Sequence, residues 1–128
     1  MLQEGDTSSW ERIFTEDDVR LFSQLSGDQG EHHMQPDAKG RIMVHGLLTA
    51  TLPTKLGGDW NYIAREMTFE FLRPVFVGDT IRCETRIERL EQSSAGYLQM
   101  AATYICRNQH GKDVLSGRTH GVIRDTKE

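Results

Sequence analysis

The chain has 128 residues and a formal net charge of -4, a length that fits one domain of the common size of about 100–150 residues. Its hydrophobic content of 37% and charged content of 27% are typical of a folded globular protein and argue against disorder. The acidic balance disfavours nucleic acid, whose phosphate backbone requires a dense lysine and arginine surface, and no apolar run approaches the roughly 20 residues that cross a bilayer. We therefore expect one cytoplasmic domain over residues 1–128, with 1–9 as a loose lead-in, and neither nucleic acid nor a membrane as a partner.

The first predicted elements are a short strand and a helix. Residues 10–14 suit a strand, and Thr15 can cap a helix whose first turn carries three acidic residues at its positive end. Apolar residues then recur at helical spacing up to Ser26 and Gly27, so one face of this helix should be buried. The periodic residues are Val19, Phe22 and Leu25, and Leu21 lies beside them.

A long loop and a buried helix should follow. Residues 27–43 combine three glycines and a proline with acidic residues and histidines, a composition that suits neither a helix nor a strand. Loops of this length in compact domains are usually functional. The apolar run over 45–56 predicts a buried helix, which Pro53 should kink or end near Thr51. Residues 57–59 predict a turn.

The second half of the chain alternates between apolar and polar residues, which is typical of strands. The expected strands span 63–72, 81–87, 98–104 and 114–124. Because the links between them are short, neighbouring strands should be antiparallel, and the fold class is α+β, with a curved sheet packed against an earlier helix. We expect Met67, Phe69 and Phe71 in the core, and Cys83 and Cys106 as buried thiols that form no disulfide.

Acidic and histidine side chains gather on the long loop, as Asp28, Glu31, His32 and His33, with His45 further on. A carboxylate and an imidazole five residues apart can converge on one water molecule. Such a pair can take a proton from water and return one to carbon, because imidazole exchanges protons near neutral pH. A metal site is not expected, because the adjacent His32 and His33 should point in different directions and no zinc-binding spacing occurs.

Three segments carry a resemblance to a known family. Residues 26–33, 44–50 and 71–80 resemble, in the same order, motifs of the MaoC-like (R)-specific enoyl-CoA hydratases. The resemblance covers nearly the whole chain, from about Phe14 to Val122. It implies a hot-dog fold, in which a curved antiparallel β-sheet wraps around a central helix. It also implies a homodimer, or a larger assembly of dimers, with active sites near the interface.

The resemblance further implies a hydro-lyase of fatty acid metabolism that acts on acyl-CoA or acyl-ACP thioesters and needs no cofactor and no metal. Asp28 and His33 fall on the family's catalytic aspartate and histidine, which activate the water that adds to the β-carbon of a trans-2-enoyl thioester. The backbone N–H of Gly46, at the start of the buried helix, would polarise the thioester carbonyl. Thr54 would support the site by orienting the aspartate.

The chain departs from the family's pattern of Asp, any residue, Asn, Pro, any residue, His. Gly30 and Glu31 replace the Asn and Pro, and the stretch from His33 to His45 is shorter, so His32 is an alternative catalytic imidazole. We expect His45 to cap or pack the helix entrance and leave it out of the catalytic set. Two other functions stay open: a thioesterase on the same fold, and a non-catalytic subunit that binds acyl thioesters or serves assembly.

Overall fold

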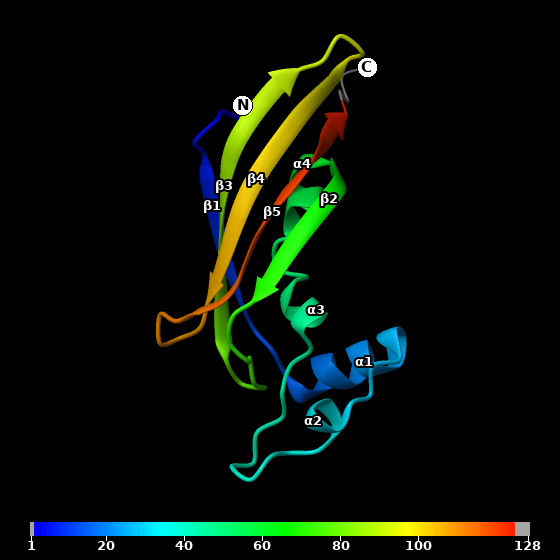
Figure 1. Ribbon diagram of the computed structural model, residues 1–128, viewed down its shortest axis with the longest axis vertical. Coiled ribbons are helices and arrows are strands. Elements are labelled where there is room, and N and C mark those ends of the chain that lie inside the picture. Colours follow the sequence, from blue (N-terminus) through cyan, green and yellow to red (C-terminus); the bar gives the residue numbers. More distant parts are fainter. Residues whose placement is uncertain (1, 125–128) are drawn as a thin grey trace.

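The computed structural model describes residues 2–124. Its elements are β1 (Thr7–Ile13), α1 (Glu16–Ser26), α2 (Glu31–Met34), α3 (Gly46–Thr49), α4 (Lys55–Trp60), β2 (Tyr62–Phe71), β3 (Thr80–Gln92), β4 (Tyr97–Arg107) and β5 (Asp113–Arg124). The five strands form one antiparallel sheet in the order β1-β3-β4-β5-β2. The short links correctly predicted the antiparallel pairs β3–β4 and β4–β5, but β2 pairs with β5 and not with β3, the strand that follows it. Figure 1 shows α3 and α4 along one side of the sheet, and α1 and α2 beyond its end. This is the expected α+β architecture. Within the described residues, no helix is both long and apolar enough to span a membrane.

Helix α1 begins with the predicted cap. The Thr15 hydroxyl accepts a hydrogen bond from Asp18 N–H, and the Asp18 carboxylate accepts one from Thr15 N–H. Gly27 ends the helix in the left-handed region, at φ 79°, where a residue without a Cβ is favoured. The buried face is narrower than predicted, because Val19 is buried whereas Leu25 is 81% exposed. The expectation for Leu25 was therefore wrong, since α1 lies beyond the end of the sheet and only one side of it meets the core.

The buried helix predicted over 45–56 is divided into two short helices. α3 ends at Thr49 and α4 starts at Lys55, and Pro53 lies between them, so the predicted break near Thr51 is confirmed. The turn predicted at 57–59 was wrong, because these residues continue α4, which ends at Asn61 in a left-handed conformation.

Two other boundaries also differ from the predictions. β1 already begins at Thr7, which pairs with Arg86 of β3, so residues 7–9 are not part of a loose lead-in. Pairing with a long neighbouring strand orders this polar segment although it has no apolar periodicity of its own. The loop predicted over 27–43 contains the one-turn helix α2, which starts directly after Gly30.

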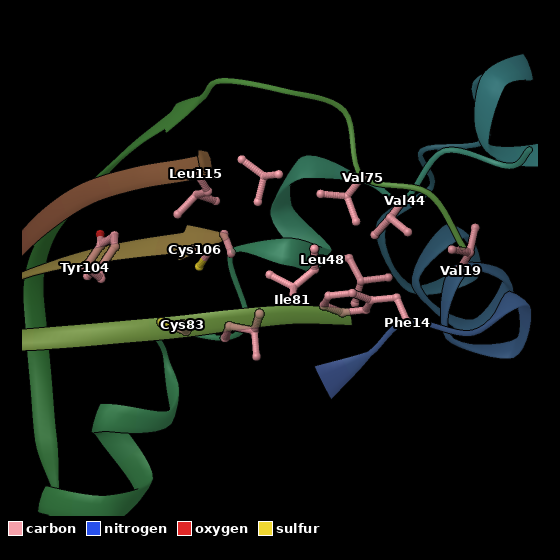
Figure 2. Packing of buried hydrophobic residues seen from close by; sticks show 13 residues of the cluster. Phe14, Val19, Val44, Leu48, Val75, Ile81, Cys83, Tyr104, Cys106 and Leu115 are labelled. Carbon is pink, nitrogen blue, oxygen red and sulfur yellow. The ribbon is translucent and has the colours of Figure 1, made fainter. Parts of the chain in front are cut away.

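The core lies between the inner face of the sheet and the segment that carries α3. Figure 2 shows Leu48 of α3 beside Ile81 and Cys106, with Val44 and Val75 toward α1. Their packing fixes α3 against the sheet, and a bond from Val44 N–H to the Val75 carbonyl (2.7 Å) ties the chain before α3 to the chain after β2. The end of the loop over residues 27–43 is therefore fixed both by the packing of α3 and by this hydrogen bond.

Cys83 and Cys106 pair directly across β3 and β4. Both are buried free thiols, as predicted, and the contact with Cys106 together with burial raises the pKa of the Cys83 thiol. The core assignment of the β2 residues was only partly right. Met67 and Phe69 are half-buried against the core, but Phe71 is 55% exposed, because it is the last residue of an edge strand that has a neighbour on only one side.

Candidate active site

A cavity of about 690 Å³ lies where α1, the loop after it, α3 and the segment after β2 meet. Its wall includes apolar side chains from four parts of the chain, namely Phe22, Leu47, Val75 and Val114. Its polar side chains are Ser26, Asp28, His32, His33, His45, Thr49 and Arg73. Ligand sites are typically apolar concavities with a few convergent polar groups. A second hollow of about 740 Å³ on the sheet contains no histidine among its lining residues, so the first cavity is the candidate site.

Asp28 and His33 come together at this cavity. His33 lies on α2 and is 5% exposed, and its Nδ1 is 2.7 Å from the carbonyl oxygen of Met43. Because a carbonyl only accepts, Nδ1 carries a hydrogen, and in the neutral form of the ring Nε2 has a free lone pair. This Nε2 is 3.7 Å from Oδ2 of Asp28. The distance is too long for a direct hydrogen bond, but both atoms can accept a hydrogen from one shared water molecule.

The loop holds the Asp28 carboxylate by a local bond. Its Oδ1 accepts a hydrogen bond from Gly30 N–H (3.2 Å), and Asp28 N–H donates to the Ser26 hydroxyl (3.0 Å). These contacts span only two residues each, as in the turns that Asp commonly forms. The side chain itself is half-exposed and lines the cavity.

His32 also lines the cavity, and its ring centroid is 3.9 Å from that of His33. The expectation that the two adjacent histidines point in different directions was therefore wrong. Gly30 is one reason: a Cβ at this position would lie 2.9 Å from Cε1 of His32. The absence of a side chain at Gly30 thus leaves the space that the His32 ring uses.

His45 is the residue whose contacts sequence reasoning missed. It is 2% exposed, and its ring stacks on that of His33 with centroids 3.7 Å apart and planes 17° apart. Its Nε2 is 2.9 Å from the carbonyl oxygen of Asp28 and 3.2 Å from Oγ of Ser23. Its place next to Gly46 at the entrance of a buried segment was the only signal in the sequence, and that signal favoured a packing role.

Gly46 and Thr54 have different positions relative to the cavity. Gly46 lines it as the first residue of α3, where a backbone N–H has no partner within the helix. Because α3 has only four residues, it lacks the long helix dipole on which the prediction relied. Thr54 is exposed, and its hydroxyl donates to the carbonyl of Thr51. The structure does not bring Thr54 to Asp28.

Thr49 is a second polar residue of the cavity wall that the sequence did not single out. It is buried, and its hydroxyl has no hydrogen-bond partner among the residues that the structure describes. The same holds for Nδ1 of His45. Buried polar atoms are usually paired, so both atoms are potential contacts for water or a ligand.

One atom each from Asp28, His33 and His45 lies within 4.8 Å of the others, a spacing that a metal ion can bridge. The ring geometry does not fit this use. A nitrogen lone pair lies in the plane of its ring, and the near-parallel planes of His33 and His45 meet only far beyond a metal–ligand distance of about 2 Å. The two imidazoles therefore cannot direct their lone pairs at one ion.

Comparisons with known proteins show which proteins the chain is similar to. A model of the thioesterase superfamily matches residues 50–99. The chain is 31% identical over 100 residues to the (R)-specific enoyl-CoA hydratase of Rhodospirillum rubrum, covering 70% of this chain and 68% of that protein. It is 21% identical over 132 residues to the mitochondrial 3-hydroxyacyl-[acyl-carrier-protein] dehydratase of Arabidopsis thaliana, covering 96% and 78%. Among solved structures, it is similar to the (R)-hydratase from A. caviae involved in PHA biosynthesis, with a TM-score of 0.84, 26% identity, and 97% and 98% of the two chains covered.

Proposed function

Because the chain belongs to the family of MaoC-like (R)-specific hydratases and dehydratases, we propose that it is a hydro-lyase. The reaction is the reversible addition of water across the double bond of a trans-2-enoyl thioester, which gives a 3-hydroxyacyl thioester. The relatives whose names state this chemistry are an enoyl-CoA hydratase and an acyl-carrier-protein dehydratase, so the thioester carrier is coenzyme A or acyl carrier protein.

The observation that carries this proposal is the spacing of two hydrogen-bond acceptors at the cavity. Nε2 of His33 and Oδ2 of Asp28 are 3.7 Å apart, and Nδ1 of His33 is engaged with Met43. A water molecule that donates one hydrogen to each acceptor keeps the lone pairs of its oxygen free. That oxygen can then attack an electrophilic carbon held in the cavity.

The chemistry balances with these two residues alone. The water oxygen forms a bond to the β-carbon of the enoyl group while one of its O–H bonds breaks, and the proton passes to the Asp28/His33 pair. The electron pair of the double bond moves toward the thioester oxygen. The Asp28/His33 pair then returns a proton to the α-carbon. No electrons are exchanged with another group, so this reaction requires no redox cofactor.

We assign the N–H of Gly46 to the thioester oxygen. This N–H belongs to the first residue of α3 and lies in the cavity wall. A donor placed where negative charge develops stabilises the transition state more than the ground state. The Gly46 N–H acts here as a single hydrogen-bond donor, without the added electrostatic field of a long helix.

The test is an assay of the purified protein with crotonyl-CoA and longer enoyl-CoA thioesters. Loss of enoyl absorbance without release of free thiol is the expected result. Release of free thiol from saturated acyl-CoA instead would support a thioesterase, the second candidate, which the thioesterase-superfamily match over residues 50–99 favours. Tight acyl-CoA binding with neither reaction would indicate a binding or assembly subunit.

We further propose a homodimer and a cytoplasmic location. The homodimer is supported by the edge strand β2, which exposes Ile63 and Phe71, and by the exposed Leu47 of α3, which lines the same cavity as Phe71. Exposed apolar groups at an unpaired edge favour contact with a second copy. The facing thiols of Cys83 and Cys106, which are unbonded, suit a reducing compartment. Sedimentation analysis tests the dimer: a monomer at micromolar concentration would contradict it.

A further inference from the structure

We propose that His45 is a positioning residue that holds Asp28 and His33 in their reactive arrangement. The inference rests on the proposed function, because it takes Asp28 and His33 as the reacting pair. The inference is supported by the buried His45 ring, which contacts both of these residues although they lie on different elements. His45 itself precedes α3, so it connects the reactive loop to the core.

His45 positions Asp28 through a hydrogen bond to the Asp28 backbone. Nε2 of His45 is 2.9 Å from the Asp28 carbonyl oxygen, which can only accept, so Nε2 carries the hydrogen. The Ser23 hydroxyl, buried on α1, lies 3.2 Å from the same nitrogen. The other hydrogen bonds of Asp28 within the described residues reach only Ser26 and Gly30. The His45 bond is therefore what ties this exposed turn to the buried part of the molecule.

His45 positions His33 through a stacking contact between the two rings. The His45 ring lies 3.7 Å from the His33 ring at an angle of 17°, which fixes the plane of the His33 ring. The bond from Nδ1 of His33 to the Met43 carbonyl (2.7 Å) fixes its rotation within that plane. Together the two contacts aim Nε2 at the Asp28 carboxylate, so a shift of His45 would move both acceptors of the proposed water.

Two substitutions separate these contacts. His45→Phe keeps a ring that can stack on His33 but removes the N–H donor. His45→Gln removes the ring but keeps an amide N–H near the position of Nε2. Ser23→Ala is the matched control, because it removes the α1 partner of the same nitrogen and leaves both contacts of His45 intact.

We expect His45→Phe to lower kcat about 10- to 100-fold with KM changed less than about threefold, since misplacing a catalytic group by about 1 Å can lower a rate 100-fold. His45→Gln should keep more of the wild-type kcat than His45→Phe, and Ser23→Ala should stay within about threefold of wild type. A merely structural role predicts something else: lower melting temperatures in both His45 variants, with unchanged kcat per folded molecule.

A second measurement does not depend on turnover. In ¹H–¹⁵N spectra, His45→Phe should shift or broaden the amide signals of Asp28 and Gly30, and His45→Gln should restore them. Unchanged signals and an unchanged kcat in His45→Phe would overturn the inference. If the wild-type protein converts no thioester, the proposed function fails, and the spectra alone decide whether His45 positions the loop. If His45→Phe does not fold, His45→Asn replaces it, because the shorter amide side chain cannot reach the Asp28 carbonyl. Wild-type spectra and a wild-type kcat in His45→Asn would equally overturn the inference.

Discussion

Replacement of Gly46 with alanine should impair catalysis while leaving the fold nearly intact. A Cβ at this position would lie 2.7 Å from Cε1 and 2.9 Å from Cδ1 of Phe71, well inside the roughly 3.5–4.0 Å of a favourable carbon–carbon contact. Gly46 is not among the glycines with positive φ, so its backbone accepts alanine. The clash therefore falls on the Phe71 ring, which is on the surface and can rotate away.

The structure limits the cost to stability. Complete burial of a phenylalanine contributes roughly 1.5–3 kcal/mol, and more than half of Phe71 is already exposed. The free energy of unfolding should therefore fall by about 1 kcal/mol at most. The effect on activity should be larger, because the displaced ring stays beside the Gly46 N–H. Loss of one oxyanion donor lowers kcat by about 10²–10³, and we expect kcat/KM for crotonyl-CoA to fall by about 100-fold.

The assay combines enoyl-CoA hydration with thermal unfolding of the same preparations. The double variant Gly46→Ala/Phe71→Ala is the matched control, because it has room for the new methyl group. It should recover most of the kcat/KM of Phe71→Ala alone. Wild-type kcat/KM in Gly46→Ala would refute the reasoning, as would a double variant as impaired as Gly46→Ala.

Three further predictions concern stability. Thr49→Val should raise the free energy of unfolding by about 1 kcal/mol in urea titration, because an unpaired buried hydroxyl costs about 1–3 kcal/mol; a lower urea midpoint would show that this hydroxyl has a partner. Gly117→Ala should destabilise the protein by about 3 kcal/mol or more, because its Cβ would lie 1.8 Å from the carbonyl oxygen of Thr68, and wild-type stability would contradict the pairing of β2 with β5. The N–H of Thr15 lowers the pKa of Asp18 below its ordinary 3.8, so the capping contribution is present above about pH 4 and is lost as the pH falls through the lowered pKa. Asp18→Ala should therefore cost about 1 kcal/mol at pH 7 and progressively less as the pH falls through the lowered pKa of Asp18, whereas a cost independent of pH would contradict this origin.

The elements that local rules determine could be predicted from the sequence. The alternation of Ile81, Cys83 and Ile87 with polar residues indicates a strand with one buried face. Thr15 indicates the start of α1, because its capping hydrogen bonds lie within four residues. Pro53 similarly breaks the central helix through its own ring. Each of these signals lies within one segment, so the three-dimensional context was not needed.

The candidate site could be predicted only in part. Asp28 and His33 are close in the sequence, so their convergence follows from one loop and one helical turn. The contacts of His45 depend on α1, the loop and α3 meeting at one point, which no local pattern encodes. Thr54 was assigned from the family resemblance, but its hydroxyl donates to the carbonyl of Thr51 after the helix break at Pro53.

The most direct test of the Asp28/His33 assignment is the kcat of Asp28→Asn for crotonyl-CoA hydration, measured beside the wild-type protein. The asparagine keeps the size and the local hydrogen bonds of the side chain but cannot take a proton from water. We expect kcat to fall by about 10²–10⁴, the usual contribution of general acid–base catalysis, with the melting temperature nearly unchanged. A folded Asp28→Asn variant that hydrates crotonyl-CoA at the wild-type rate would contradict a role for this carboxylate in activating water.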